Sequence, residues 1–141
     1  DQGNILLFCR YVDDCYVVLK KGLCEQILAE LNNFDPILQF TIEKMESNTL
    51  NFLDTSTYLD KNKIPQLKFF RKETASEVKI NFKNSIQPLK YKTFSLVGDL
   101  YRCSYTTTTE NDLNQALKDM SNIYAKNGYP PKPHFAKNIR T

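Results

Sequence analysis

The stretch "FCRYVDDCYVVL", residues 8–19, places two adjacent carboxylates, Asp13 and Asp14, in a run that is otherwise typical of a buried β-strand. Apolar runs lie on either side of the pair, "NILLFC" at 4–9 and "CYVVLK" at 15–20. Two strands joined by a short polar turn predict a β-hairpin. Like charges at neighbouring positions repel, and ionised carboxylates among apolar residues are costly unless a positive charge compensates them. The hairpin therefore needs a cationic partner for its two aspartates.

Divalent metal ions are one such partner. They are hard cations that take oxygen ligands, and Mg²⁺ is commonly held by one or two carboxylates together with substrate phosphates. Two such ions about 4 Å apart stabilise the attacking and leaving oxygens of a phosphoryl transfer. The alternative is structural, because aspartate is common in turns of any kind. The flanking Arg10 and Tyr11, with apolar strands on both sides, favour the metal site.

The rest of the first half predicts a helix followed by an antiparallel β-meander. "LCEQILAELNNF" (23–34) has apolar residues at helical spacing, and Asp35-Pro36 ends it. Three strand-like segments follow, separated by the turns "SNT" and "DKNK": residues 37–44, 50–59 and 65–72. This order of elements predicts an α+β fold.

The second half is predicted to be helical, apart from an ambiguous segment at 76–85. Residues 89–105 place Phe94, Val97, Leu100 and Tyr101 on one helical face. Any residue of the threonine run 106–109 can cap a second helix, which ends near Gly128. The apolar positions of that helix are Leu113, Ala116, Leu117, Met120 and Ile123.

Composition narrows the class of protein. The chain has 141 residues, a formal charge of +3 and 12% aromatic residues, which is typical of a globular protein that tolerates a polyanionic partner. Its apolar runs are too short to span a bilayer, and it has no secretory signal. Four cysteines, without the spacing of a zinc site, are expected to be reduced thiols: Cys9, Cys15, Cys24 and Cys103. We expect an intracellular protein, in the nucleus, the cytoplasm or both. The missing initiator methionine suggests a fragment.

The motif "RYVDDCYVV" resembles the Tyr-x-Asp-Asp catalytic hairpin of reverse transcriptases. Three later segments resemble, in order, those of Penelope-like retroelement polymerases: "LQFTIEKMESNTLNFLDTSTYL", "FFRKETASEVKINFKNSIQPLKYK" and "KNGYPPK". The resemblance covers residues 8–135. It implies a distal polymerase palm at residues 1–72 and a helical thumb-like, or helix-turn-helix-like, region at 73–141.

The resemblance also implies roles for individual residues. Asp13 and Asp14 would be the catalytic ligands of Mg²⁺ or Mn²⁺, with two ions in the complete enzyme. Tyr11 and Val12 would lie against the primer terminus or the incoming nucleotide. A primer-grip hairpin would contain Phe52, Leu53 and Asp54. Lys44 is a candidate for the lysine that assists pyrophosphate departure, and a solvated lysine at the end of a strand is the alternative.

The chain departs from the family pattern before the hairpin. Relatives carry another catalytic aspartate on an upstream strand, together with nucleotide-binding fingers, whereas only nine residues precede Arg10 here. The expected partners are therefore the N-terminal palm and fingers of the same polypeptide, a primed RNA or DNA template and deoxynucleoside triphosphates. Without that third ligand, this chain alone is expected to be inactive.

Basic residues interleaved with aromatics predict a nucleic-acid surface on residues 71–102. Basic side chains contact phosphates and aromatic rings stack on bases. The basic residues are Arg71, Lys72, Lys79, Lys83, Lys90, Lys92 and Arg102, and the aromatics include Phe69, Phe70, Phe82, Tyr91 and Phe94. An ordinary amphipathic helix with solvated lysines is the alternative.

Three functions remain open from the sequence. The first is a fragment of an RNA-directed DNA polymerase. The second is a decayed or domesticated retroelement piece that only binds nucleic acid or protein. The third is a metal-binding hairpin in an unrelated globular protein.

Overall fold

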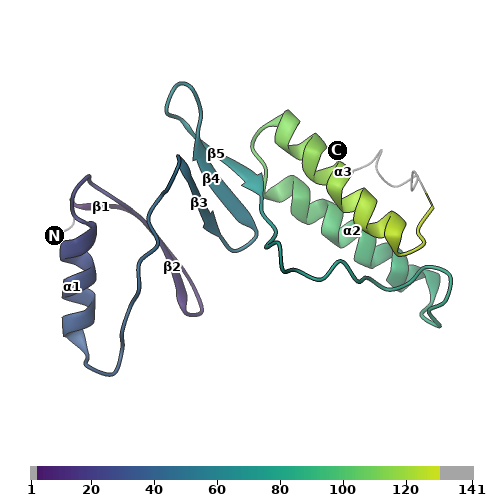
Figure 1. Cartoon of the computed structure of the whole chain (residues 1–141), viewed down its shortest axis with the longest axis horizontal. Coiled ribbons are helices and arrows are strands. Elements are labelled where there is room, and N and C mark those ends of the chain that lie inside the picture. The colour runs from purple at the N-terminus through teal and green to yellow at the C-terminus, as the bar shows by residue number, and fades with distance from the viewer. Residues whose placement is uncertain (1–2, 131–141) are drawn as a thin grey trace. The chain divides into compact units, whose positions relative to one another are not determined.

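The computed structural model describes residues 3–130, which form two small antiparallel sheets and three helices (Figure 1). The α+β class predicted from the sequence is confirmed. The chain divides into two compact units, with the division between Met45 and Glu46. The palm and thumb boundary predicted between residues 72 and 73 concerns function and stays a prediction. Among residues 3–130, no helix combines the length and the apolar character that a membrane crossing requires.

Unit 1, which ends at Met45, begins with the predicted hairpin. β1 (Ile5–Tyr11) pairs with β2 (Asp14–Leu19) in antiparallel register, and Tyr11 lies opposite Asp14. The strands approach the turn more closely than expected, because Arg10 and Tyr11 belong to β1 and only Val12 and Asp13 remain between the strands. The predicted hairpin is confirmed, with a tighter turn.

The predicted helix of unit 1 is also confirmed. α1 (Cys24–Phe34) follows Gly22, whose φ of +89° is accessible to glycine at little cost, and it ends at the extended Asp35 before Pro36. Ile27 and Leu28 are half-buried, and α1 has no fully buried residue. α1 therefore has no fully buried face.

The predicted strand at residues 37–44 is wrong. This segment contains no strand, although its apolar residues alternate. The backbone of Phe40 is paired by a side chain and not by a strand. Asn32 of α1 donates from Nδ2 to the Phe40 carbonyl at 3.1 Å and accepts from the Phe40 N–H at 2.6 Å. Alternation makes a segment suitable for a sheet, but a strand also needs a neighbour to pair its backbone groups. No neighbouring strand is present among the described residues of unit 1.

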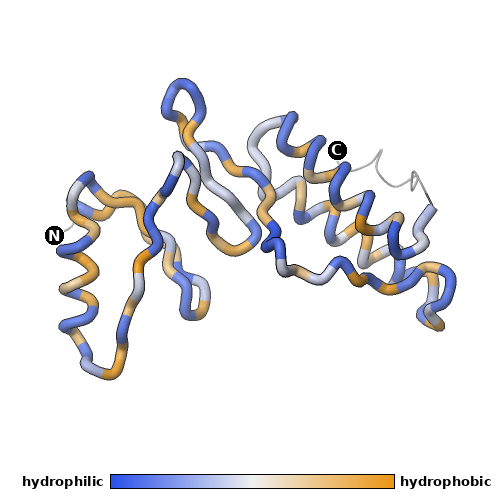
Figure 2. Tube along the Cα trace, in the orientation of Figure 1, coloured by the Kyte–Doolittle hydropathy of each residue, from blue (hydrophilic) through white to orange (hydrophobic). Residues whose placement is uncertain are grey.

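Unit 1 buries very little. None of its residues from 3 to 45 is fully buried, although apolar residues run along β1 (Figure 2). Ile5, Leu6, Leu7 and Phe8 are all exposed. Successive side chains of a strand point to opposite faces, so β1 exposes apolar side chains on both of its faces.

Unit 2, from Glu46 onward, begins with a three-stranded antiparallel sheet in the order β3-β4-β5. β3 (Thr49–Phe52) and β4 (Thr55–Leu59) form a hairpin, so the single strand predicted at 50–59 is wrong. The pattern of residue types does not mark this turn, because the turn contains no glycine: Leu53 itself adopts a φ of +52°. β5 (Pro65–Phe69) then pairs with β4, and it is shorter than the predicted 65–72.

Two antiparallel helices supply the core of unit 2. α2 (Leu89–Tyr105) matches the predicted helix, and α3 (Glu110–Lys126) matches the second (Figure 1). Phe69, Phe82 and Leu117 pack against this core. The core itself consists of residues from both helices and one that follows them: Leu96, Leu100, Cys103, Leu113, Ala116, Met120, Ile123, Tyr124 and Tyr129. The predicted apolar face of α3 is confirmed.

The predicted face of α2 is rotated from the real one. Leu100 is buried as expected, but Phe94 and Tyr101 are exposed and Val97 is only half-buried. The buried positions are Lys92, Leu96, Leu100 and Cys103. Because α2 carries apolar or aromatic residues around most of its circumference, helical spacing alone could not tell which row faces the core.

The ends of α3 follow the predicted signals. Thr109, the last threonine of the run, is the N-cap, and its side chain accepts a hydrogen bond from the Asp112 N–H at 3.2 Å. Asn127 is the C-cap, and Gly128 follows with a φ of +83°.

Candidate functional site

The β1–β2 turn is a strained backbone at the motif that the sequence singles out. Val12 has a φ of +51°, which is a genuine outlier for a β-branched residue. The Arg10 side chain supports the turn, since its Nε donates to the Val12 carbonyl at 2.8 Å. Such strain costs of order 1–3 kcal/mol and clusters at active sites and ligand clamps. The observed outlier therefore supports a functional interpretation of the hairpin.

Asp13 lies in the turn and Asp14 begins β2, and both are exposed. Residues directly opposite one another in an antiparallel pair share a face, so Asp14 lies on the face of Tyr11. Exposed, adjacent carboxylate oxygens fit a hard divalent cation that retains part of its water shell. Among residues 3–130, however, no group of three His, Cys, Asp or Glu side chains is placed to hold a metal.

The β3–β4 turn resembles the β1–β2 turn in sequence and backbone. It contains Phe52, Leu53 and Asp54, an aromatic, an aliphatic residue with positive φ and an aspartate, as does Tyr11-Val12-Asp13. Asp54 is anchored twice: its side chain pairs with Arg102 Nε at 2.9 Å, and its carbonyl accepts from the Phe70 N–H at 2.8 Å. The predicted primer-grip residues thus form a tight hairpin tip, and their role stays a prediction.

Lys44 lies at the end of the irregular segment of unit 1. Its ammonium forms an ion pair with Glu25 of α1, and both side chains are largely exposed. The hydrogen bond and charge of Glu25 raise the pKa of Lys44 above its usual value. The ion pair holds the Lys44 side chain against α1. The predicted role of Lys44 beside pyrophosphate stays a prediction.

Four of the seven basic residues predicted to bind nucleic acid make contacts within unit 2, and the other three are exposed to solvent. Lys92 is buried, and its Nζ donates to the carbonyls of Phe82 at 2.7 Å and Ser85 at 2.9 Å. Three others are engaged in contacts within unit 2: Arg71, Lys79 and Arg102. Lys72, Lys83 and Lys90 are exposed, and the Lys90 ammonium lies 5.1 Å from the Tyr91 ring centroid.

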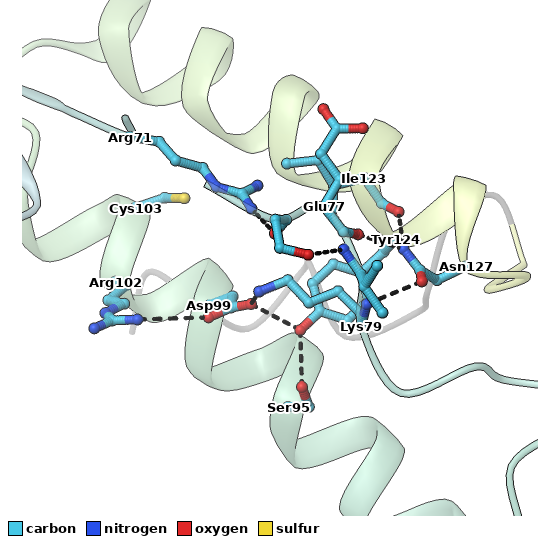
Figure 3. Close-up of polar contacts among 12 residues, drawn as sticks. Arg71, Glu77, Lys79, Ser95, Asp99, Arg102, Cys103, Ile123, Tyr124 and Asn127 are labelled. Carbon is cyan, nitrogen blue, oxygen red and sulfur yellow. Dashed lines mark hydrogen bonds and ion pairs between the residues drawn. The ribbon is translucent and has the colours of Figure 1, made fainter. Parts of the chain in front are cut away.

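Asp99 is the centre of a polar network that the sequence did not indicate (Figure 3). Its Oδ2 accepts from Lys79 Nζ at 2.7 Å and from the Tyr124 hydroxyl at 2.8 Å, and Ser95 Oγ lies 2.9 Å from that hydroxyl. Burial, followed by the bond to Asp99, raises the pKa of Tyr124, so its hydroxyl stays protonated at neutral pH. This network joins α2, α3 and the segment before them.

The irregular segment 71–88 is fastened across the helices chiefly by one residue. The Asn127 side chain accepts from the Lys79 N–H at 2.9 Å and donates to the Glu77 carbonyl at 2.8 Å, as Figure 3 shows. The Asn127 carbonyl also accepts from the Phe82 N–H at 3.0 Å. Tyr129 packs on Phe82 and Tyr124 beside it. The closing Asn-Gly-Tyr-Pro motif therefore has a structural role here.

Comparison of this chain with protein-family models, curated proteins and solved structures finds no match.

Proposed function

We propose that this chain is part of an RNA-directed DNA polymerase of a retroelement, comprising its distal palm and a thumb-like helical region. The observation that carries the proposal is the Tyr11-Val12-Asp13-Asp14 turn, with its positive φ at Val12 and its two exposed carboxylates. The turn presents its acidic side chains to solvent, and no described residue of unit 1 is buried, so core packing does not explain the strained backbone. It is suited to holding ligands in a fixed geometry.

Asp13 and Asp14 are the proposed ligands of Mg²⁺ or Mn²⁺. Their oxygens can supply two protein ligands, and the phosphates of a deoxynucleoside triphosphate can supply others. When bound, a pair of such ions stabilises the attacking and leaving oxygens of nucleotidyl transfer. Tyr11 and Val12 would orient the primer terminus or incoming nucleotide, with Lys44 on the pyrophosphate side. The hairpin tip at Phe52–Asp54 would contact the primer.

The exposed apolar surface of unit 1 supports the proposed protein partner. β1 exposes four consecutive large apolar side chains, and the alternating segment 37–44 lacks a paired neighbour among the described residues. An N-terminal palm and fingers of the same polypeptide would cover the exposed side chains of β1 and would supply a strand that pairs with segment 37–44. That partner would also supply the third carboxylate. The complete enzyme would act inside the cell, in the nucleus or the cytoplasm.

The exposed lysines support contact with a primed template. Lys72, Lys83 and Lys90 can meet phosphates without giving up a role in the core, whereas Lys92 cannot. Phosphate contacts give binding that is steeply salt-dependent and almost indifferent to sequence. The proposed nucleic-acid surface therefore consists of fewer residues than the seven predicted from the sequence, with Lys72, Lys83 and Lys90 as its phosphate contacts.

A second candidate function is a retroelement remnant that only binds nucleic acid or protein. The exposed Lys72, Lys83 and Lys90 would serve this function equally, because phosphate contacts need no metal site.

Primer extension distinguishes the two candidates. The test uses this chain joined to an N-terminal palm and fingers that carries the upstream aspartate. We expect Asp13→Asn to abolish synthesis in that protein while duplex binding stays within twofold, and Glu43→Gln, an exposed acid of unit 1, to retain synthesis. The chain by itself should not extend a primer, because phosphoryl transfer depends on fully positioned metals. Synthesis that survives Asp13→Asn would refute the polymerase proposal.

A further inference from the structure

An exposed aromatic row runs along α2 on the side away from the core. Tyr91 is 50% exposed, Phe94 67%, Tyr101 40% and Tyr105 83%. With Gly98 between the two pairs, the spacings are three, four, three and four residues, which keeps a row on one side of a helix. At 1.5 Å per residue the row is about 21 Å long. We call these five residues the aromatic row.

Gly98 has no explanation within the chain. It lies in the middle of α2, where glycine costs about 1 kcal/mol relative to alanine. A Cβ added there would meet nothing within 4 Å, so no close contact within the chain excludes a side chain. The glycine nevertheless leaves a notch in the row between Phe94 and Tyr101. A notch that the fold does not require is explained by the close approach of a ligand from outside.

The charges beside the row select the occupant. Lys90 is exposed and forms no ion pair in the described part of the chain, whereas Arg102 is paired with Asp54, and the one acid of α2, Asp99, is engaged inside unit 2. A second copy of α2 would bring another Lys90 to one end of the row. The row therefore suits a polyanion.

We propose that the aromatic row binds single-stranded nucleic acid, with unpaired bases stacked on its rings and one base or sugar in the Gly98 notch. A duplex presents phosphates and base edges, whereas a single strand also presents the faces of its bases. Four rings in a row match a single strand, and Lys90, beside Tyr91, can meet one of its phosphates. The inference deepens the proposed function, since it names the strand that the helical region would hold.

The test is fluorescence anisotropy of the 141-residue chain with labelled twelve-nucleotide oligo(dT) and with a twelve-base-pair duplex. Each base stacked on an aromatic ring adds substantially to affinity. We expect Phe94→Ala with Tyr101→Ala to weaken oligo(dT) binding at least tenfold and to leave duplex binding within twofold. Phe34→Ala, which removes an exposed phenylalanine from α1, is the matched control and should change neither.

Gly98→Ala separates binding from folding. The open space at Gly98 and the higher helix propensity of alanine predict an unchanged or raised midpoint of thermal unfolding. Oligo(dT) binding should nevertheless fall at least threefold, because the notch is filled. Ser121→Ala, at an exposed position of α3, is the control for helix propensity and should bind like the parent chain.

Three outcomes would overturn the inference. Oligo(dT) binding that is absent or unaffected by the double variant removes the row from the site. Binding of a poly(glutamate) peptide with the same dependence on the row and equal affinity would assign it to an acidic protein partner. Equal loss of duplex and oligo(dT) binding would show that the row grips any nucleic acid. None of these results bears on primer extension, which tests the proposed polymerase separately.

Discussion

Lys92 shows how the environment of one residue decides between a binding role and a structural one. Its side chain is 7% exposed, and its ammonium lies over the Phe82 ring while donating to two backbone carbonyls. A buried charge is tolerated only when it is paired or fully hydrogen-bonded. Lys92 therefore fastens the turn at residues 82–85 to α2, which takes it out of the predicted phosphate-binding set.

Lys92→Met is expected to destabilise the protein by about 2 kcal/mol, because it leaves buried carbonyls without a donor. Urea unfolding followed by circular dichroism measures the change. Lys90→Met removes an exposed lysine two residues away and should alter the free energy of unfolding by less than about 0.5 kcal/mol. A stable Lys92→Met protein with weakened duplex binding would restore the nucleic-acid role.

Metal binding by Asp13 is the second property of a single residue that can be tested. The isolated chain is expected to bind Mn²⁺ weakly, with a dissociation constant above the micromolar range, because two carboxylates supply only part of a coordination shell. Asp13→Asn should abolish that binding in a calorimetric titration, and Glu43→Gln should leave it unchanged. Sub-micromolar affinity would reveal a further ligand, and binding that persists in Asp13→Asn would exclude this residue from the site.

The types of residue in the sequence single out the paired aspartates as a candidate site, but they do not indicate the polar network around Asp99. Adjacent acids in an apolar run stand out in a sequence, because their charge repulsion is local. A single aspartate such as Asp99 on a helix with exposed lysines is typical of a solvated surface. Its actual partners, Lys79 and Tyr124, lie 20 and 25 residues away along the chain. The packing of α2 against α3 brings Tyr124 to Asp99, and the attachment of segment 71–88 to Asn127 brings Lys79 there.

At the scale of elements, a turn with positive φ at an apolar residue accounts for one of the two errors in the strands. Glycine and asparagine are the usual signals for such turns. The β3–β4 turn uses Leu53 instead, so two strands were taken for one. Segment 37–44 shows the opposite error, since its alternation is real but no strand lies beside it in the described chain. The helices were predicted better, because their apolar residues recur at helical spacing and α3 also carries local signals at both ends.

Leu53→Gly tests the strain at the β3–β4 turn. The left-handed conformation costs a non-glycine residue roughly 1–2 kcal/mol, and glycine loses about 0.5–1 kcal/mol more backbone entropy on folding. Because Leu53 is exposed, the substitution should leave the free energy of unfolding unchanged or raise it by about 1 kcal/mol. Asn51→Gly, in the middle of β3 and exposed, should instead lower it. Equal losses in the two variants would rule out stored strain at Leu53.

At the scale of the molecule, the two units differ in what holds them together. Unit 2 has a core of nine buried apolar and aromatic residues, whereas no described residue of unit 1 is buried. Cooperative unfolding of the isolated chain should therefore report mainly on unit 2. The core of unit 2 contains three ionisable groups whose pKa values are raised by burial, Cys103, Tyr124 and Tyr129, which makes its stability sensitive to alkali.

Stability is expected to fall as the pH rises above about 9. Burial, with a further contribution from Asp99, raises the pKa of the Cys103 thiol to about 11 from an ordinary value of 9.0. Between these values the unfolded chain has lost the thiol proton and the folded chain retains it. Fewer protons bound to the unfolded state mean that the free energy of unfolding decreases with pH, by about 1 kcal/mol per pH unit between pH 9 and 10. Below pH 9 the thiol has no effect, and above pH 10 Tyr124 adds to the loss.

Urea unfolding at pH 7, 8, 9 and 10, with a reducing agent to protect the exposed Cys9 and Cys15, measures this slope. Cys103→Ala should lower stability at pH 7, because it leaves a small cavity in the core. Between pH 9 and 10, however, its stability should decline less steeply than that of the parent chain. Cys24→Ala removes a half-buried thiol from unit 1 and should keep the parent slope. Parallel curves for the parent chain and Cys103→Ala would show that this thiol does not ionise on unfolding, and the alkaline loss would then belong to the tyrosines.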